Sequence, residues 1–129
     1  MPAVRHHMSG DLLSVEAGVS INEVAQRMVD RNVGAVLVLD AGRLTGILTE
    51  RDVLRAVARG LDDATRVRDC MTTHPETIAP DDRTEQAAVL MLHGGFRHLP
   101  VVQGDNPVGV ISIRDLVPLL LEDTAPRGV

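Results

Sequence analysis

Apolar residues recur along this chain with helical and strand spacings. Across Ile21–Val29 they fall at i, i+3, i+4, i+7 and i+8, which predicts a helix with one buried face. Continuous apolar runs at Ala35–Leu39 and Leu99–Val102 are short enough to be strands buried on both faces. Each run leads through a turn into a second apolar stretch, Leu44–Leu48 or Val108–Ile111. The pattern therefore predicts two pairs of strands, the first preceded by a helix.

A short extended stretch opens each predicted half, at Leu13–Glu16 and again at Glu76–Ala79. Ser20 and Glu23 predict a capping box at the start of the first helix. The corresponding helix of the second half has its apolar face at Thr84, Ala87, Ala88, Met91 and Leu92, and is opened by Asp82 and Glu85.

A second helix closes each half. Its apolar positions are Val53, Leu54, Val57 and Ala58 in the first half and Leu116, Val117, Leu120 and Leu121 in the second. Pro118 removes the hydrogen bond to the Arg114 carbonyl, so we expect a kink or a weakened turn there. The predicted fold class is α/β, of the α+β kind, with two β-α-β-β-α units.

The two halves are copies of one repeat. Gly46-Ile-Leu-Thr-Glu-Arg-Asp52 and Gly109-Val-Ile-Ser-Ile-Arg-Asp115 share one pattern at an offset of 63 residues, the separation of Asp52 and Asp115. The alignment continues without a gap from residues 4–54 onto residues 67–117. We therefore predict domains at residues 4–60 and 67–122, a linker at residues 60–66, and a frayed tail at residues 123–129.

Composition argues against several classes of partner. Phe96 is the single aromatic residue, so the chain lacks the stacking platform of single-stranded nucleic-acid binders. The net charge is −5 and the scattered basic residues are all Arg, which argues against a duplex-binding face. No apolar run approaches the roughly 18 residues of a membrane span, and residues 1–10 lack a signal core. We expect a soluble cytoplasmic protein without a membrane partner.

Catalytic and metal chemistry find little support in the sequence. Cys70 is the only cysteine, so no intrachain disulfide or CxxC motif exists. No histidine is assigned to Cys70 as a base, and no P-loop is present. The soft groups near the repeat starts, which are His6, His7, Met8, Cys70 and Met71, are too few for a usual ligand set. We expect no enzyme activity, no metal site and no catalytic cofactor.

The repeated motif ends in Thr49-Glu-Arg-Asp52 and Ser112-Ile-Arg-Asp115, which has two interpretations. A (Ser/Thr)-x-x-Asp pattern after a strand predicts a helix capping box. The same geometry also suits a ligand, because a helix N-terminus attracts phosphate and an Asp one turn in can accept two ribose hydroxyls.

Other residues near the motif are equally open to two interpretations. Gly46 and Gly109 either ease a strand turn or let a ligand approach the backbone. Arg97 and His98 either bind phosphate or cover a strand end in solvent.

The chain resembles a tandem pair of CBS domains, a Bateman module. The resemblance rests on Met71-Thr72 before Pro75, on Thr77-Ile78-Ala-Pro80-Asp81, on Arg97-His98-Leu99-Pro100-Val101-Val102, and on the Gly-to-Asp motif at the end of each copy. It covers nearly the whole chain. The chain departs from the family pattern at Gly34-Ala-Val-Leu-Val38, where the first copy lacks the cations that Arg97 and His98 provide in the second.

The resemblance implies two repeats packed through their sheets about a pseudo-twofold axis, with a cleft on each side. In many family members these clefts bind AMP, ADP, ATP or S-adenosylmethionine. The motif Asp holds the ribose hydroxyls, the Thr or Ser faces the phosphate, and the adenine lies against the linker and the middle strand. Many members also dimerise through their helices.

Carried onto this chain, the resemblance predicts two ligand sites. The first comprises Thr49, Arg51 and Asp52, the linker His74, Pro75 and Glu76, and the cations Arg97 and His98. The second comprises Ser112, Arg114 and Asp115, the linker Asp11, Leu12 and Leu13, and Gly34. The aliphatic candidates to hold the adenine are Leu13, Val33, Ile47 and Val110. Because Asp11 adds negative charge and Gly34 adds none to balance it, we expect the Asp52 site to bind anionic nucleotides more tightly.

These expectations lead to a regulatory module that binds an adenine nucleotide as a ligand rather than as a catalytic cofactor. Without a catalytic domain in the chain, we expect the signal to reach a separate, unknown protein partner or to act through a homodimer. The alternative function is a ligand-free scaffold for protein interaction or dimerisation. Nucleic-acid binding is a third hypothesis, which the charge and the aromatic count disfavour.

Overall fold

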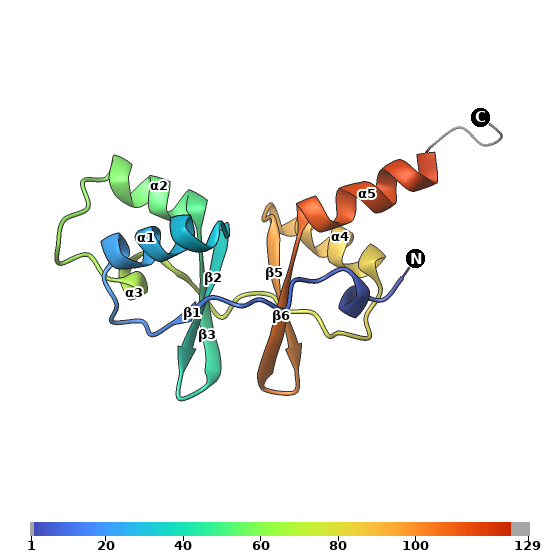
Figure 1. Ribbon diagram of the computed structural model, residues 1–129, viewed down its shortest axis with the longest axis horizontal. Coiled ribbons are helices and arrows are strands. Elements are labelled where there is room, and N and C mark those ends of the chain that lie inside the picture. The colour runs from blue at the N-terminus through green and yellow to red at the C-terminus, as the bar shows by residue number, and fades with distance from the viewer. Residues whose placement is uncertain (1, 125–129) are drawn as a thin grey trace. The chain divides into compact units, whose positions relative to one another are not determined.

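The computed structural model describes residues 2–124, which fold as two compact units of mixed α and β structure (Figure 1). One unit, residues 11–75 with 104–107, contains helices α1 (Ile21–Arg31) and α2 (Glu50–Ala58) and is called the α1–α2 unit. The other, residues 2–10, 76–103 and 108–124, contains α4 (Thr84–Gly94) and α5 (Ile113–Thr124) and is called the α4–α5 unit.

The α1–α2 unit has a four-stranded sheet in the order β1-β2-β3-β4. Its strands are β1 (Ser14–Val15), β2 (Ala35–Asp40), β3 (Arg43–Thr49) and β4 (Thr72–Thr73), and the short helix α3 (Val67–Cys70) precedes β4. β1 runs parallel to β2, whereas β2–β3 and β3–β4 are antiparallel. Ala41 and Gly42 join β2 to β3 with φ of 51° and 81°, the positive values that a tight hairpin turn requires.

The periodic apolar positions of α1 bury one face of this helix against the sheet. The Ser20 hydroxyl caps α1 by accepting the Glu23 N–H at 3.2 Å, and Asn32 ends it in the left-handed region. The core comprises Leu13, Val15, Ile21, Val24, Met28, Val36, Val38, Leu48 and Val67. The predicted capping box is only half formed, because the Glu23 carboxylate pairs with Arg27 Nη2 at 2.7 Å, one turn along the helix.

The α4–α5 unit repeats this plan with fewer strands. It holds a 3₁₀ turn at Val4–His6, and β5 (His98–Gln103) pairs with β6 (Asn106–Ser112) in a two-stranded sheet. Its core comprises Val4, Ile78, Ala87, Met91, Leu99, Val101, Ile111, Leu116 and Leu119. Helix α5 continues through Pro118 to Thr124, so the start of the predicted tail is helical, and residues 125–129 lie outside the described part of the chain.

The segment that opens each repeat packs in the unit built around the other repeat. Val4 and Val67 occupy equivalent repeat positions, and both are fully buried in these two cores. Beyond them, Ser9 pairs with Val110, and Thr72 pairs with Ile47. The compact units are therefore composed differently from the domains predicted at residues 4–60 and 67–122.

Gly46 and Gly109 lie inside β3 and β6, where these incoming segments cross. A Cβ on Gly46 would stand 2.7 Å from Met71 Sδ and 2.9 Å from the Thr72 carbonyl oxygen. A Cβ on Gly109 would meet Met8 Sδ at 2.6 Å and the Ser9 carbonyl oxygen at 2.9 Å. The predicted strand turn is therefore wrong for both glycines, and what approaches their backbone in the described structure is a neighbouring strand segment.

The extended stretch predicted at Glu76–Ala79 forms only an isolated parallel bridge, Ile78 to Val101. In the other unit, the Leu37 N–H donates to the Leu13 carbonyl at 3.0 Å and supports a two-residue strand. Pro100 stands at the position equivalent to Leu37 and has no N–H to donate. One lost ladder bond accounts for the shorter pairing.

The helices bury narrower faces than the apolar pattern predicts. Val29 of α1 is 75% exposed, and its repeat equivalent Leu92 of α4 is 81% exposed. In α2 the buried position is Ala56, and in α5 the buried positions are Leu116 and Leu119. The predicted apolar positions that remain exposed on these two helices are Leu54, Val57, Ala58, Val117, Leu120 and Leu121.

Candidate functional site

A hydroxyl and a carboxylate meet at the N-terminus of α2 and again at the N-terminus of α5. Asp52 Oδ2 accepts hydrogen bonds from the Thr49 N–H at 2.9 Å and from Thr49 Oγ1 at 3.1 Å, while the Asp52 N–H donates to Thr49 Oγ1 at 3.4 Å. Asp115 and Ser112 form the same three bonds at 2.8, 3.0 and 3.3 Å. The capping interpretation of both motifs is confirmed.

Capping leaves the second carboxylate oxygen of each Asp outside these bonds. Asp52 Oδ1 forms a weak ion pair with Arg55 Nη1, at a distance of 3.8 Å. The Asp52 side chain is 11% exposed. Both motifs therefore place a half-buried carboxylate and a hydroxyl at the positive end of a helix. Such a pair can accept hydrogen bonds from a ligand's hydroxyl groups without giving up its capping bonds.

The backbone ahead of β2 and β5 contacts these two helix ends. The Glu50 N–H donates to the Gly34 carbonyl at 3.0 Å, and the Ile113 N–H donates to the Arg97 carbonyl at 2.8 Å. Gly34 therefore lies beside the Asp52 motif, and Arg97 lies beside the Asp115 motif in its own unit. The Arg97 side chain is exposed, as phosphate binding requires.

The fifteen predicted ligand residues divide between the two units. The α1–α2 unit holds Leu12, Leu13, Gly34, Thr49, Arg51, Asp52, His74 and Pro75. The α4–α5 unit holds Glu76, Arg97, His98, Val110, Ser112, Arg114 and Asp115. Within each unit the structure brings the hydroxyl and the carboxylate together, as their spacing predicts. The backbone beside them belongs to Gly34 in the α1–α2 unit and to Arg97 in the α4–α5 unit, whereas the predicted sites grouped Gly34 with Asp115 and Arg97 with Asp52.

His74, which was predicted to contact the adenine, and the aliphatic candidates have clear structural roles. His74 has a positive φ of 49° and donates its N–H to the Thr45 carbonyl at 3.2 Å, which holds the linker against β3. Leu13 and Ile47 are buried, and Val33 packs against the core of the α1–α2 unit. Val110 is half-buried beside Ser9, and Arg51 and Arg114 are exposed in the first turns of α2 and α5.

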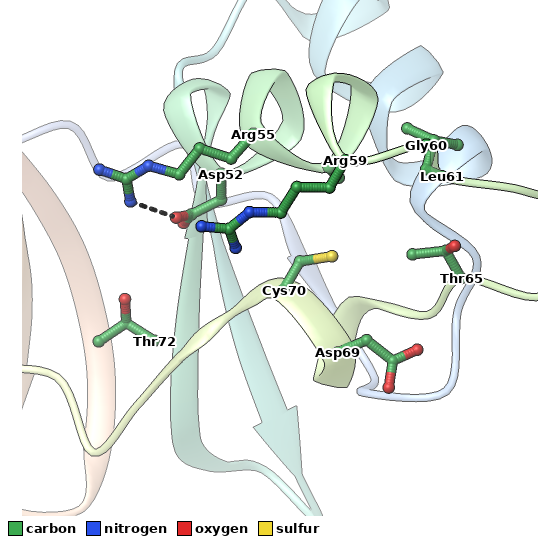
Figure 2. Close-up of a pocket in the computed structure, with 10 residues that line it drawn as sticks. Asp52, Arg55, Arg59, Gly60, Leu61, Thr65, Asp69, Cys70 and Thr72 are labelled. Carbon is green, nitrogen blue, oxygen red and sulfur yellow. Dashed lines mark ion pairs between the residues drawn. The ribbon is translucent and has the colours of Figure 1, made fainter.

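A pocket of about 380 Å³ opens beside Asp52, within the α1–α2 unit (Figure 2). The lining side chains used below are those of Asp52, Arg55, Arg59, Thr65, Cys70 and Thr72. Sequence reasoning missed Arg55 and Arg59, although their spacing of three and seven residues from Asp52 places them on the same face of α2. Arg55 and Arg59 therefore extend the candidate site beyond the motif.

Cys70 lies in this pocket as a free thiol. Burial raises the pKa of the Cys70 thiol, and the Asp69 and Asp52 carboxylates raise it further, against a smaller lowering by Arg59. The protonated thiol is a weak nucleophile, so the pocket does not activate Cys70.

Other kinds of site are not supported by the described part of the chain. Among these residues, no three His, Cys, Asp or Glu side chains gather as they would around a metal ion. Nor does any of the described helices have the length and apolar character needed to cross a membrane.

Comparisons with known proteins agree on one family. The family model of the CBS domain matches residues 4–59 and 67–122. The CBS domain-containing protein YhcV of Bacillus subtilis is 37% identical over 117 residues, which are 90% of this chain and 84% of that protein.

Solved structures show the same fold. A CBS-domain containing protein from Agrobacterium tumefaciens has a TM-score of 0.84 at 34% identity, covering 92% of this chain and 98% of that one. A CBS domain protein from Pyrobaculum aerophilum, solved in complex with AMP, has a TM-score of 0.83 at 30% identity, covering 95% and 99%. The two matched repeats and the mixed α/β fold make this chain a member of the CBS domain family, with a tandem pair of CBS domains.

Proposed function

We propose that this protein is a regulatory module that binds an adenine nucleotide and passes the signal to a partner chain. The observation that carries the proposal is the duplicated hydroxyl–carboxylate pair at the start of α2 and α5, with the same three hydrogen bonds in each. A relative that is 30% identical over nearly the whole chain was solved with AMP, which supports an adenine nucleotide as the ligand class.

In this proposal the carboxylate oxygen that capping leaves over, on Asp52 or Asp115, accepts the ribose hydroxyls. The Thr49 or Ser112 end of the helix faces the phosphate, where the helix dipole and the first-turn N–H groups favour negative charge. Asp52 also lines a pocket of about 380 Å³ within its own unit, which offers a ligand contacts beyond the motif. The Asp52 site is therefore the tighter of the two.

Calorimetric titration of the wild type and two variants tests this proposal. The ligands are AMP, ADP, ATP and S-adenosylmethionine, with GMP to test base preference. We expect Asp52→Asn to weaken binding of the preferred ligand at least tenfold and Asp115→Asn to weaken it less. A thermal-shift screen supports the titration, because a ligand at a hundred times its Kd adds about 2.7 kcal/mol of stability.

Both substitutions also disturb a hydrogen bond between the Asp side chain and a backbone N–H, so a control that loses such a bond elsewhere is needed. Asp82 accepts the Ala79 N–H at 2.9 Å and lies outside the proposed site. Asp82→Asn should alter stability without altering affinity. Absence of binding by every ligand at millimolar concentration would overturn the proposal and favour the scaffold function.

The scaffold function also has an observation in its favour, which is the exposed apolar helix surface. Val29, Leu54 and Val57 are exposed in one unit, and their repeat equivalents Leu92, Val117 and Leu120 are exposed in the other. A second copy of the chain presents the same surface, which suits the self-complementary interface of a twofold dimer. We propose that the module forms a homodimer through these helices, whether or not it binds a nucleotide.

A further inference from the structure

The pocket beside Asp52 continues the proposed nucleotide site along one face of α2. Thr49, Asp52, Arg55 and Arg59 follow one another at intervals of three, three and four residues, which places them in a row on the helix. The proposed function assigns phosphate to Thr49 and the ribose hydroxyls to Asp52. In that assignment Arg55 and Arg59 follow Asp52 along α2, on the side away from Thr49 and the phosphate assigned to it.

The pocket is lined by two guanidinium groups and two carboxylates. Both lining carboxylates already accept hydrogen bonds: Asp52 Oδ2 accepts from Thr49, and Asp69 Oδ2 accepts the Arg66 N–H at 2.8 Å. In Figure 2 the Asp69 carboxylate points away from Arg59, whereas the Asp52 carboxylate points toward Arg55. Among the described residues, Arg59 is therefore the lining guanidinium that pairs with neither carboxylate.

The two Arg side chains are also available to a ligand. Arg55 is 57% exposed and reaches Asp52 only at 3.8 Å. Within the described part of the chain, the Arg59 guanidinium has no hydrogen bond or ion pair, and Figure 2 shows it above Cys70 on the side of Asp52. The Thr72 side chain lines the same pocket and adds a hydroxyl donor.

We infer that this pocket receives a phosphate ester carried on a ribose hydroxyl, so that the preferred ligand is an adenine nucleotide with a 2′- or 3′-phosphate. The inference rests on the proposed function, because it takes Asp52 as the group that faces the ribose. Arg55 and Arg59 bind the extra phosphate, and Asp52 keeps the neighbouring free hydroxyl. In dinucleotide-binding folds an Arg near the ribose accommodates a ribose phosphate, since its planar fork donates two bonds to phosphate oxygens.

Titration with three nucleotides tests the inference: adenosine 5′-monophosphate, adenosine 2′,5′-bisphosphate and adenosine 3′,5′-bisphosphate. We expect the wild type to bind one of the two bisphosphates at least tenfold more tightly than AMP. Arg55→Gln and Arg59→Gln should each reduce that preference, measured as the ratio of the bisphosphate and AMP affinities of the same variant, at least fivefold. Which bisphosphate is preferred identifies the phosphorylated hydroxyl.

Two further variants test whether the preference for a bisphosphate comes from the pocket or from the positive charge of the unit as a whole. Arg43→Gln removes the same charge from an exposed position of the same unit outside the pocket, and it should keep the full preference. Arg59→Lys keeps the charge but loses the planar fork, so it should keep part of the preference. Melting curves of each variant without ligand show that the fold is intact.

The possible failures are distinguishable. Equal affinity for AMP and both bisphosphates in the wild type would overturn this inference and leave the proposed function standing. A preference that survives in the double variant of Arg55→Gln and Arg59→Gln would overturn it as well. If the wild type binds none of the three nucleotides, the proposed function fails and this inference fails with it.

Discussion

At the scale of single residues, the missing side chains of Gly46 and Gly109 decide whether two strand segments can cross. Each glycine lies inside a strand, and the backbone of the incoming segment passes within 2.9 Å of the place where a Cβ would stand. The obstacle is partly a carbonyl oxygen, which a side-chain rotation cannot move. Both glycines of the repeated motif therefore have a packing role that is independent of any ligand.

Gly46→Ala is accordingly expected to destabilise the protein by about 1–3 kcal/mol, because the added methyl overpacks the β3–β4 contact. Urea unfolding followed by circular dichroism measures the loss. Gly10→Ala is the matched control, since a Cβ at Gly10 meets nothing within 4 Å, and surface changes of this kind stay within about 0.5 kcal/mol. Equal stability of the two variants would contradict this account.

Site residues were predictable where the motif is local and less so where tertiary structure places them. Thr49 with Asp52 and Ser112 with Asp115 form the contacts that their spacing predicts, because the capping box needs only one turn of helix. Arg55 and Arg59 were missed because two Arg on an exposed face match an ordinary solvated surface. Only the fold of α3 and β4 against α2 gives those Arg side chains a pocket.

At the scale of elements, the long periodic segments and the two-residue strand β1 were predictable, and the other short segments were not. The helices beginning at Ile21 and Thr84 and the four main strands lie where the apolar pattern puts them. The turn at Val4–His6, helix α3 and strand β4 were missed, because segments of two to four residues carry no period. These segments form where the start of each repeat packs in the unit of the other repeat, so tertiary contacts fix them.

Val4 provides the test of this exchanged packing. Val4→Ala removes fully buried methyl groups from the core of the α4–α5 unit, so we expect a loss of about 1–3 kcal/mol. Val67→Ala should cost a similar amount, because Val67 is equally buried at the equivalent position of the other core. Chemical unfolding of each variant measures both losses.

The control for Val4 is another valine of the same unit. Val89 is 54% exposed on α4, so Val89→Ala should change stability by no more than about 0.5 kcal/mol. If Val4→Ala is as neutral as Val89→Ala, residues 4–10 do not stabilise the α4–α5 unit.

At the scale of the whole molecule, the repeat places equivalent apolar side chains on exposed helix positions in both units. Leu54 is 68% exposed on α2, and its equivalent Val117 is 41% exposed on α5. The apolar pattern predicted both positions as part of a buried face, and the structure of the single chain leaves them uncovered. A face that is apolar in sequence and exposed in the monomer is consistent with burial against a second copy.

Sedimentation velocity tests the proposed homodimer. We expect the wild type to sediment as a dimer at micromolar concentration, which corresponds to an association free energy of about −8 kcal/mol. Leu54→Glu and Val117→Glu each place a charge in the apolar surface and should give folded monomers, because a buried unpaired carboxylate costs several kcal/mol. Gln103→Glu adds the same charge type at an exposed position at the end of β5, away from these helices, and should leave the dimer intact.

Salt dependence separates this apolar interface from an electrostatic one. Burial of Leu54, Val57 and their equivalents does not depend on charge, so the dimer should persist at high ionic strength, whereas contacts between exposed ion pairs weaken as salt screens them. A wild type that is monomeric at every concentration tested, or a Leu54→Glu variant that still dimerises, would mean that these helices do not form the interface. A monomeric module would have to pass its signal to the partner chain without rearrangement of a dimer.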